Sequence, residues 1–407
     1  MANHKHEKGV ENVLILQGGG SLGAFACGVF KAFAKKNKKF DIIAGTSIGG
    51  INGAIAAGSN NDRPEVDLEN FWLDLAESSY NIIPDIFTFD FDYQKYQTKL
   101  KRSPAASLNA AFYGVPDFFI PRWLNFNISN LDSSQIEQYY QPPWKWTYIY
   151  DNSVLSKTLE KYIDFKKLSP RSQQNNTNES NSNGNTRLII TAVDVLSAEP
   201  LIFDSYKRTI EMKHLLATIG YPQYGFPWVK VSDGKFAWDG SLLSNTPIRE
   251  VMVSSPSKNK NIFVVENYPR KIEKLPANMS EVMSRAKDIM FSDKTESLEK
   301  MSRLITRHVN LIEELYDIVQ ASDQKKIEKE KIDYINKEHY TLVEKHGAKI
   351  LKLKRITRII PESPYPLQNA DFSVETIKEL IRQGEKKAVE YLDRLAIFKF
   401  NLHNGLI

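Results

Sequence analysis

Apolar and polar positions alternate along the first 60 residues in the order expected of strands and helices in turn. Two short apolar runs, "NVLILQ" (12–17) and "FDIIAGT" (40–46), are each followed by glycines. After each run comes a segment with small and apolar residues at helical spacing, "LGAFACGVFKAFAKK" (22–36) and "IGGINGAIAAG" (48–58). The pattern predicts strand, turn and helix twice over, and therefore parallel strands joined by a right-handed crossover.

The middle of the chain loses this periodicity. Residues from about 68 to 150 are rich in aromatic residues and prolines, as in "FYGVPDFFIPRW" (112–123). Two interpretations stay open: an irregular subdomain with its own small core, or a cap over an apolar site that also touches lipid. Residues 169–187, "SPRSQQNNTNESNSNGNTR", have the composition of a disordered surface insertion. Strand-like runs return at "RLIITAVDV" (187–195) and "NIFVVEN" (261–267).

The last third of the chain has long segments of helical periodicity. One of them, residues 297–320, is expected to form a helix whose apolar stripe faces a core, with the positions Leu298, Met301, Leu304, Ile305, Val309, Ile312, Leu315 and Val319. We therefore expect a catalytic domain over 10–275, containing the cap-like insertion (about 68–150) and the disordered loop (169–187). A helical C-terminal extension over 279–407 follows it.

Composition narrows the class of protein. Of 407 residues, 42% are hydrophobic and 25% charged, as in soluble globular proteins. A net charge of +5 does not suggest a nucleic-acid partner, although it is compatible with attraction to anionic lipid headgroups. The single cysteine, Cys27, excludes an internal disulfide and fits a reducing compartment. With no apolar leader or spanning run, we expect a cytoplasmic protein, with peripheral membrane contact left open. Nothing in the sequence sets the oligomeric state.

The turn after the first strand, "QGGGSLG" (17–23), allows two functions. Gly18, Gly20 and Gly23 have the G-x-G-x-x-G spacing of dinucleotide-binding loops. The backbone N–H groups of such a loop, at the start of a helix, could instead donate hydrogen bonds to an oxyanion. A dinucleotide site needs an acidic residue at the end of the second strand, but Asp41 lies at its start and Ser47 follows its end. The sequence therefore favours the oxyanion.

Gly45-Thr46-Ser47-Ile48-Gly49 matches G-x-S-x-G, the tight strand-to-helix turn that exposes a nucleophilic serine. Glycines two residues before and after Ser47 remove side chains that would clash in such a turn. The N-terminus of the following helix adds positive potential near an alkoxide or an oxyanion.

The base that would activate this serine is not an obvious histidine. None of the seven histidines follows a strand in a loop, where a general base is normally displayed, and His214 is better explained as a helix residue. Asp239, in "KFAWDGSLLSNTP" (235–247), follows an apolar strand and precedes a glycine turn. It could take the serine proton directly, or it could be an Asx-turn residue.

Three ordered motifs resemble the patatin-like phospholipase family: "GGGSLG" (18–23), "GTSIG" (45–49) and "DGS" (239–241). "ATIGYPQYGFPWVKV" (217–231) resembles the family's segment before its aspartate. "RITRIIPES" (355–363) and "DFSVETIKELIRQG" (371–384) resemble a C-terminal extension of a bacterial-type subgroup. The resemblance covers most of the chain apart from the two insertions. It implies a three-layer α/β/α fold with a mainly parallel central sheet.

The resemblance also implies roles for individual residues. Ser47 would be the nucleophile and Asp239 the base, with the oxyanion hole formed by backbone N–H groups of Gly18, Gly19 and Gly20. Further glycines would support the motifs: Gly23, Gly45, Gly49 and Gly240. Two departures remove no catalytic atom: Leu22 stands where the family often has Arg or Lys, and Ser241 where it commonly has Gly or Ala.

The function implied is serine-dependent hydrolysis of carboxylic esters in phospholipids or related acyl lipids through an acyl-enzyme, with no metal or organic cofactor. An acyltransferase with the same dyad, or a non-catalytic lipid-binding protein of this fold, stays an alternative. The sequence leaves the headgroup and acyl length open.

Overall fold

The computed structural model describes residues 9–80, 104–124, 142–170, 186–292, 295–322, 327–361, 364–365 and 367–403. Most of the Asn-rich insertion predicted over 169–187 lies outside the described residues. So do residues 81–103 and 125–141 of the 68–150 segment.

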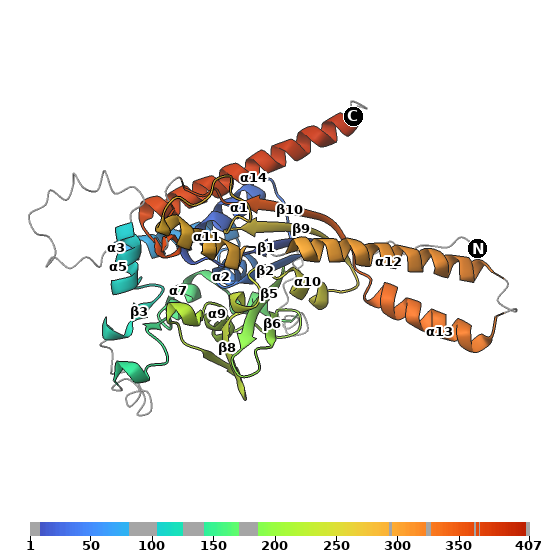
Figure 1. The fold of residues 1–407 in the computed structure, drawn as a ribbon, viewed down its shortest axis with the longest axis horizontal. Helices are drawn as coiled ribbons and strands as arrows, with labels where there is room; N and C mark the ends of the chain where they lie inside the picture. Colours follow the sequence, from blue (N-terminus) through green and yellow to red (C-terminus); the bar gives the residue numbers. More distant parts are fainter. Residues whose placement is uncertain are drawn as a thin grey trace, which may run out of the picture.

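An eight-stranded sheet forms the centre of the molecule (Figure 1). Its main path runs in the order β10 (Ile350–Thr357), β9 (Asn259–Glu266), β1 (Val10–Leu16), β2 (Ile42–Thr46), β5 (Arg187–Asp194), β8 (Lys235–Asp239) and β7 (Val229–Ser232). The first five of these strands are parallel. Strands β8 and β6 (Pro200–Asp204) both pair with β5 in the antiparallel direction. The predicted mainly parallel sheet is confirmed.

Helices cover both faces of this sheet, which confirms the three layers. Along β1, Leu14 and Leu16 belong to one apolar core, while Val13 and Ile15 belong to the other, because successive side chains of a strand point to opposite faces. The larger core is covered by α1 (Ala24–Lys35), α2 (Ile48–Ala57), α3 (Pro64–Tyr80), α9 (Met212–Thr218) and α14 (Val374–His403). The smaller core packs under α10 (Ile248–Ser254).

Further helices, strands and turns complete the described part of the chain. The remaining helices are α5 (Pro104–Tyr113), α7 (Leu155–Tyr162), α11 (Met279–Phe291), α12 (Thr295–Ala321), α13 (Lys329–His339) and a π-helical segment (Tyr340–Lys345). Strands β3 (Ile120–Pro121) and β4 (Tyr150–Asp151) pair with each other. Single 3₁₀ turns form at η1 (Gly20–Gly23), η3 (Arg122–Leu124), η5 (Pro143–Lys145), η6 (Phe165–Leu168), η7 (Pro222–Tyr224), η8 (Gly240–Leu242) and η11 (Gln368–Ala370). No described helix is long and apolar enough to cross a bilayer.

The C-terminal segment, expected to be helical, also contributes a strand and a long helix to the main body. Strand β10 forms the edge of the sheet beside β9. Helix α14 lies across α1 at glycines of both helices: a Cβ on Gly28 would come within 1.8 Å of the Ile381 carbonyl oxygen. A Cβ on Gly384 would come within 2.0 Å of the Phe25 carbonyl oxygen. Only glycines permit this crossing.

Helices α12 and α13 form a hairpin that projects from the rest of the molecule (Figure 1). The helix predicted over 297–320 is present, but the prediction that its whole apolar stripe faces a core was wrong. Val309 is buried, whereas Leu304, Ile305 and Leu315 are exposed. The periodicity of a sequence predicts the apolar face of a helix, but it does not say how much of that face a neighbour covers.

Candidate active site

Ser47 lies in the turn between β2 and α2, where the backbone is strained. Its φ of 57° and ψ of −134° are rarely adopted by a residue with a side chain. The two motif glycines make the turn possible: a Cβ on Gly45 would come within 2.2 Å of the Gly49 oxygen, and one on Gly49 within 2.2 Å of the Leu16 oxygen. The turn places Ser47 at the wall of a cavity and directly before the N-terminus of α2.

The glycine loop lies against this serine. A Cβ on Gly18 would come within 2.7 Å of the Ser47 Cβ, so the loop could not approach as closely with a larger residue. The Gly18 N–H, however, donates to Asn245 Oδ1 at 2.9 Å. The Gly18 N–H is therefore already engaged, and the role of the three glycines as oxyanion donors stays a prediction of the sequence. Within the described residues, no hydrogen bond is found from the N–H of Gly19 or Gly20, which leaves these two as the candidate donors.

Two asparagines that the sequence analysis missed hold this loop. Asn267, at the end of β9, donates from Nδ2 to the carbonyl oxygens of Gln17 and Gly18, both at 3.1 Å. Asn245 donates from Nδ2 to the Phe291 oxygen at 3.1 Å. The loop is thus fixed by side chains far away in the sequence. Asn245 lies in the "SNTP" that trails Asp239, which was the only local sign of it.

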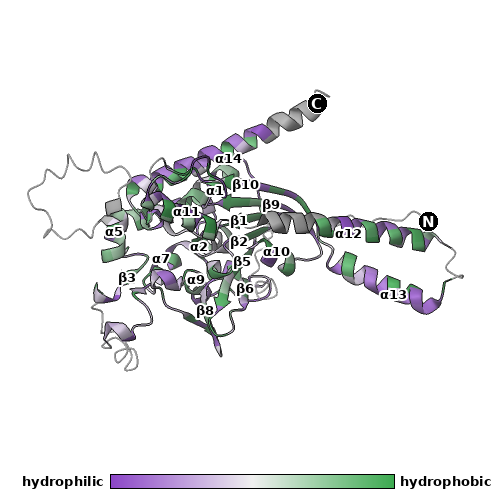
Figure 2. Ribbon diagram, in the orientation of Figure 1, coloured by the Kyte–Doolittle hydropathy of each residue, from purple (hydrophilic) through white to green (hydrophobic). Residues whose placement is uncertain are grey.

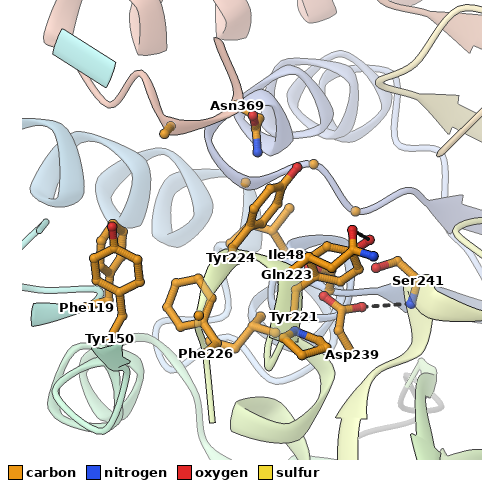
Figure 3. Close-up of a pocket in the computed structure, with 18 of the residues that line it drawn as sticks. Ile48, Phe119, Tyr150, Tyr221, Gln223, Tyr224, Phe226, Asp239, Ser241 and Asn369 are labelled. Carbon is orange, nitrogen blue, oxygen red and sulfur yellow. Dashed lines mark hydrogen bonds between the residues drawn. The ribbon is translucent and has the colours of Figure 1, made fainter. Parts of the chain in front are cut away.

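Asp239 ends β8, is 1% exposed and also lines the cavity. Its Oδ1 accepts a hydrogen bond from the Ser241 N–H at 2.8 Å (Figure 3). Burial raises the pKa of Asp239 to about 6, although hydrogen bonds from Ser241 and from the Ser47 side chain act in the opposite direction. The structure thus brings Ser47 and Asp239 together, with a carboxylate that is ionised at neutral pH yet basic enough to take a proton.

Threonines on neighbouring elements position the two turns. The Ser47 N–H donates to Thr218 Oγ1 at 2.9 Å, and Thr218 Oγ1 donates to the Thr191 oxygen at 2.7 Å. A Cβ on Gly240 would come within 2.6 Å of Thr191 Oγ1, which explains the glycine after Asp239. Thr218 was not predicted, because a threonine near the end of a helix has no distinctive sequence pattern.

The last supporting glycine, Gly23, precedes α1. A Cβ there would come within 2.7 Å of Ile48 Cγ2, so Gly23 lets the start of α1 pack against the start of α2. Gly23 therefore supports the relative position of the two turns and does not line the cavity.

The cavity has a volume of about 390 Å³ and two distinct walls. One wall carries Ser47, Asp239 and the glycines of the loop. The other is apolar and aromatic, and its residues include Phe119, Tyr150 and Phe226, whose ring centroids lie 5.0–5.6 Å from one another (Figure 3). The arrangement places an apolar surface next to a nucleophile, as an acyl ester requires.

Segments outside the three motifs complete the cavity. From the described part of the 68–150 segment come Ala111, Phe118, Phe119, Ile149 and Tyr150. Beyond residue 252 come Tyr268, Phe291, Leu367, Asn369, Ala370 and Phe372. The C-terminal segment lies close to the glycine loop: a Cβ on Gly20 would come within 2.3 Å of the Asn369 carbonyl oxygen. Both the cap-like segment and the C-terminal segment therefore contribute walls.

No histidine of the described residues lines the cavity. His214 is buried in α9, where Nδ1 accepts the Glu211 N–H at 2.9 Å, and burial lowers its pKa to about 4. It is a helix residue, as expected. The described residues contain no group of three His, Cys, Asp or Glu side chains placed to hold a metal.

Comparison with known proteins shows the family to which the chain belongs. Residues 14–252, more than half of the chain, match the family model "Patatin-like phospholipase". No curated protein matched the sequence. Among solved structures, the chain is similar to VipD from Legionella pneumophila, at 14% identity and a TM-score of 0.30, over 94% of this chain and 67% of that one. At these values only the family match bears on function.

Proposed function

The chain belongs to the patatin-like phospholipase family, a family of lipid hydrolases, and we propose that it cleaves carboxylic esters of acyl lipids with a Ser47–Asp239 dyad. The single observation that carries the proposal is the convergence of three features at one wall of an apolar cavity. They are the strained Ser47, the buried Asp239, and the N–H groups of Gly19 and Gly20, which donate to no acceptor among the described residues.

The chemistry follows from these positions. Ser47 Oγ attacks the ester carbonyl carbon while its proton passes to the Asp239 carboxylate. The carbonyl oxygen becomes an oxyanion that accepts hydrogen bonds from the N–H groups of Gly19 and Gly20, supported by the N-terminus of α2. The carbon–oxygen bond to the alcohol then breaks, and Asp239 returns the proton to the leaving oxygen. Water attacks the acyl-Ser47 by the same steps and releases the fatty acid.

The aromatic wall supports an acyl chain as the part of the substrate that enters the cavity. Burial of each methylene group against such a wall contributes about 0.8 kcal/mol. Contact with a membrane surface and a cytoplasmic location remain predictions of the sequence.

Acyl transfer is the main alternative within the same mechanism, because an alcohol or a thiol could replace water in the second half. A lipid-binding protein without catalysis is the other alternative. The strain at Ser47 argues against it, because a binding protein has no need to keep such a backbone.

The proposal is tested by incubating the full chain with defined phospholipids and with p-nitrophenyl esters of increasing acyl length. Fatty acid release should fall by about 10⁴-fold or more in Ser47→Ala. It should be unchanged in Ser257→Ala, a matched change on an exposed loop outside the cavity. Added glycerol or ethanol separates the two reactions: acyl esters of the alcohol replace the fatty acid only if the protein is a transferase. Equal hydrolysis by Ser47→Ala would overturn the dyad.

A further inference from the structure

A stripe of apolar side chains on α12 is exposed to solvent. Leu304, Leu311, Leu315 and Ile318 are 45%, 52%, 53% and 65% exposed. Together with the exposed His308 they recur at steps of four and three residues, the spacing of a coiled-coil seam. We call these five residues the α12 seam. It covers about 21 Å of helix, at 1.5 Å per residue.

Other sides of α12 are already in contact with the protein. Tyr316 stacks on His339 of α13 at a centroid distance of 3.7 Å, above an apolar groove between the two helices. Lys349, just before β10, donates to Asn310 and forms an ion pair with Glu313. Leu315 lines the groove as well as the seam, so the apolar surface is continuous, and Figure 2 shows hydrophobic residues along the projecting part of α12.

Charged residues of opposite sign flank the seam. Arg307 directly precedes His308, and Glu314 directly precedes Leu315, so the two occupy the same heptad position one repeat apart. Both side chains are exposed, and neither forms an ion pair within the described chain. Residues at this position choose the partner and the orientation of a coiled coil.

We propose that two copies of this chain associate through their α12 seams, with the helices antiparallel about a twofold axis. In the register whose twofold axis lies between His308 and Leu311, Leu304 packs on the partner's Leu315 and His308 on the partner's Leu311. Because the interface is symmetric, each contact is made twice.

The charges select this arrangement. The same antiparallel register places Arg307 beside the partner's Glu314, again twice. A parallel arrangement would instead set His308 on the partner's His308 and place Arg307 beside the partner's Ile312, leaving both charges without a complement. A second copy in the antiparallel orientation therefore satisfies the apolar and the charged positions together.

Sedimentation velocity of the full chain at micromolar concentrations tests the proposal. The wild type should sediment with twice the chain mass of 46.6 kDa. Arg307→Glu and Glu314→Arg should each be monomeric, because each brings like charges together. The double variant should recover the dimer, and an equimolar mixture of the two single variants should form a heterodimer. Glu77→Arg, a matched charge reversal on the exposed side of α3, should remain dimeric.

Cysteine crosslinking tests the orientation. Leu304→Cys mixed with Leu315→Cys should form a disulfide between chains, whereas Leu304→Cys alone should not. Crosslinking of Leu304→Cys with itself would overturn the antiparallel arrangement.

A monomeric wild type, or single charge variants that still dimerise, would overturn the proposal. In the monomeric case, loss of binding to anionic vesicles by Leu311→Glu would assign the seam to a lipid surface instead. Unchanged ester hydrolysis and circular dichroism in every variant would establish that the fold is intact.

Discussion

The two walls of the cavity are built by different means. We call the wall that carries Ser47, Asp239 and the glycine loop the reacting wall, and the aromatic one the apolar wall. On the reacting wall, the turns are fixed by close backbone approaches that only glycine permits. A Cβ added to Gly45, for example, would come within 2.2 Å of the Gly49 oxygen. On the apolar wall, aromatic rings from distant segments pack on each other, as Phe119 on Phe226 at 5.4 Å and Phe118 on Phe372 at 5.6 Å. This difference predicts that residues of the reacting wall cannot be replaced without loss of the reaction. Side chains of the apolar wall, in contrast, can change and thereby alter the choice of substrate.

The largest effect is expected from Asp239→Asn. Turnover should fall by about 10⁴-fold, because the amide cannot take the Ser47 proton. The same variant should be more stable at pH 8. The folded pKa of about 6 lies above the ordinary 3.8, so the folded state loses stability as pH rises between these values.

The gain in unfolding free energy of Asp239→Asn should approach about 3 kcal/mol above pH 6 and vanish below about pH 4. Urea unfolding of both proteins at pH 8 and at pH 4 measures it. A variant less stable than the wild type at pH 8 would mean that the buried carboxylate carries no such cost.

A smaller loss is expected from Gly20→Ala. Gly20 has a φ of +58°, and a Cβ there would meet the Asn369 oxygen at 2.3 Å, so the loop must shift and displace its N–H groups. We expect kcat to fall by about 10²–10³-fold. Gly234→Ala is the matched control, since Gly234 has a φ of +68° but no atom of the described residues within 4 Å of the added Cβ. Equal losses in the two variants would point to backbone strain alone.

The activity of the reacting wall should depend on pH through the ionisation of its base, Asp239. Because Asp239 must be ionised, kcat/KM should fall tenfold per pH unit below about pH 6. Ser241→Ala should move this midpoint upward, because the Ser241 side chain donates a hydrogen bond that lowers the pKa of Asp239. A profile of initial rates from pH 4 to 8 measures both. If the midpoint is the same in Ser241→Ala as in the wild type, a group other than Asp239 titrates.

The apolar wall should give the smallest effect, and a selective one. Phe226→Ala should lower kcat/KM for long-chain esters by about tenfold, because an apolar pocket discriminates by only a few kcal/mol. The acetyl ester, which does not reach the aromatic rings, should be hydrolysed as before and serves as the internal control. Equal losses for both esters would mean that Phe226 supports the reacting wall.

The same contrast explains what the sequence could predict. The turns at Ser47 and Asp239 were predictable because their backbone geometry restricts the residues at each position, and so was the parallel core from β1 to β2. Asn267 and Thr218 were not, because they act through hydrogen bonds to residues distant in the sequence. The hydrogen bond from Gly18 to Asn245 could not be predicted for a similar reason, because it joins two separate segments.

Elements of the C-terminal segment were missed for another physical reason. Strand β10, "ILKLKRIT", lies at the edge of the sheet and carries exposed charged residues. It therefore lacks the apolar run of a buried strand, and its sequence could not be distinguished from the helical segments around it. For α12, periodicity predicted the helix but not its exposure, which depends on whether a partner covers the seam. The division into domains at about 275–279 stays a prediction.

Labelling with a fluorophosphonate tests whether Ser47 is the nucleophile. Mass spectrometry of the labelled full chain should find one adduct, on the peptide that contains Ser47. The adduct should form more slowly in Asp239→Asn and below pH 6, and be absent in Ser47→Ala. An adduct on another serine, or equal labelling of Ser47→Ala, would exclude Ser47 as the nucleophile.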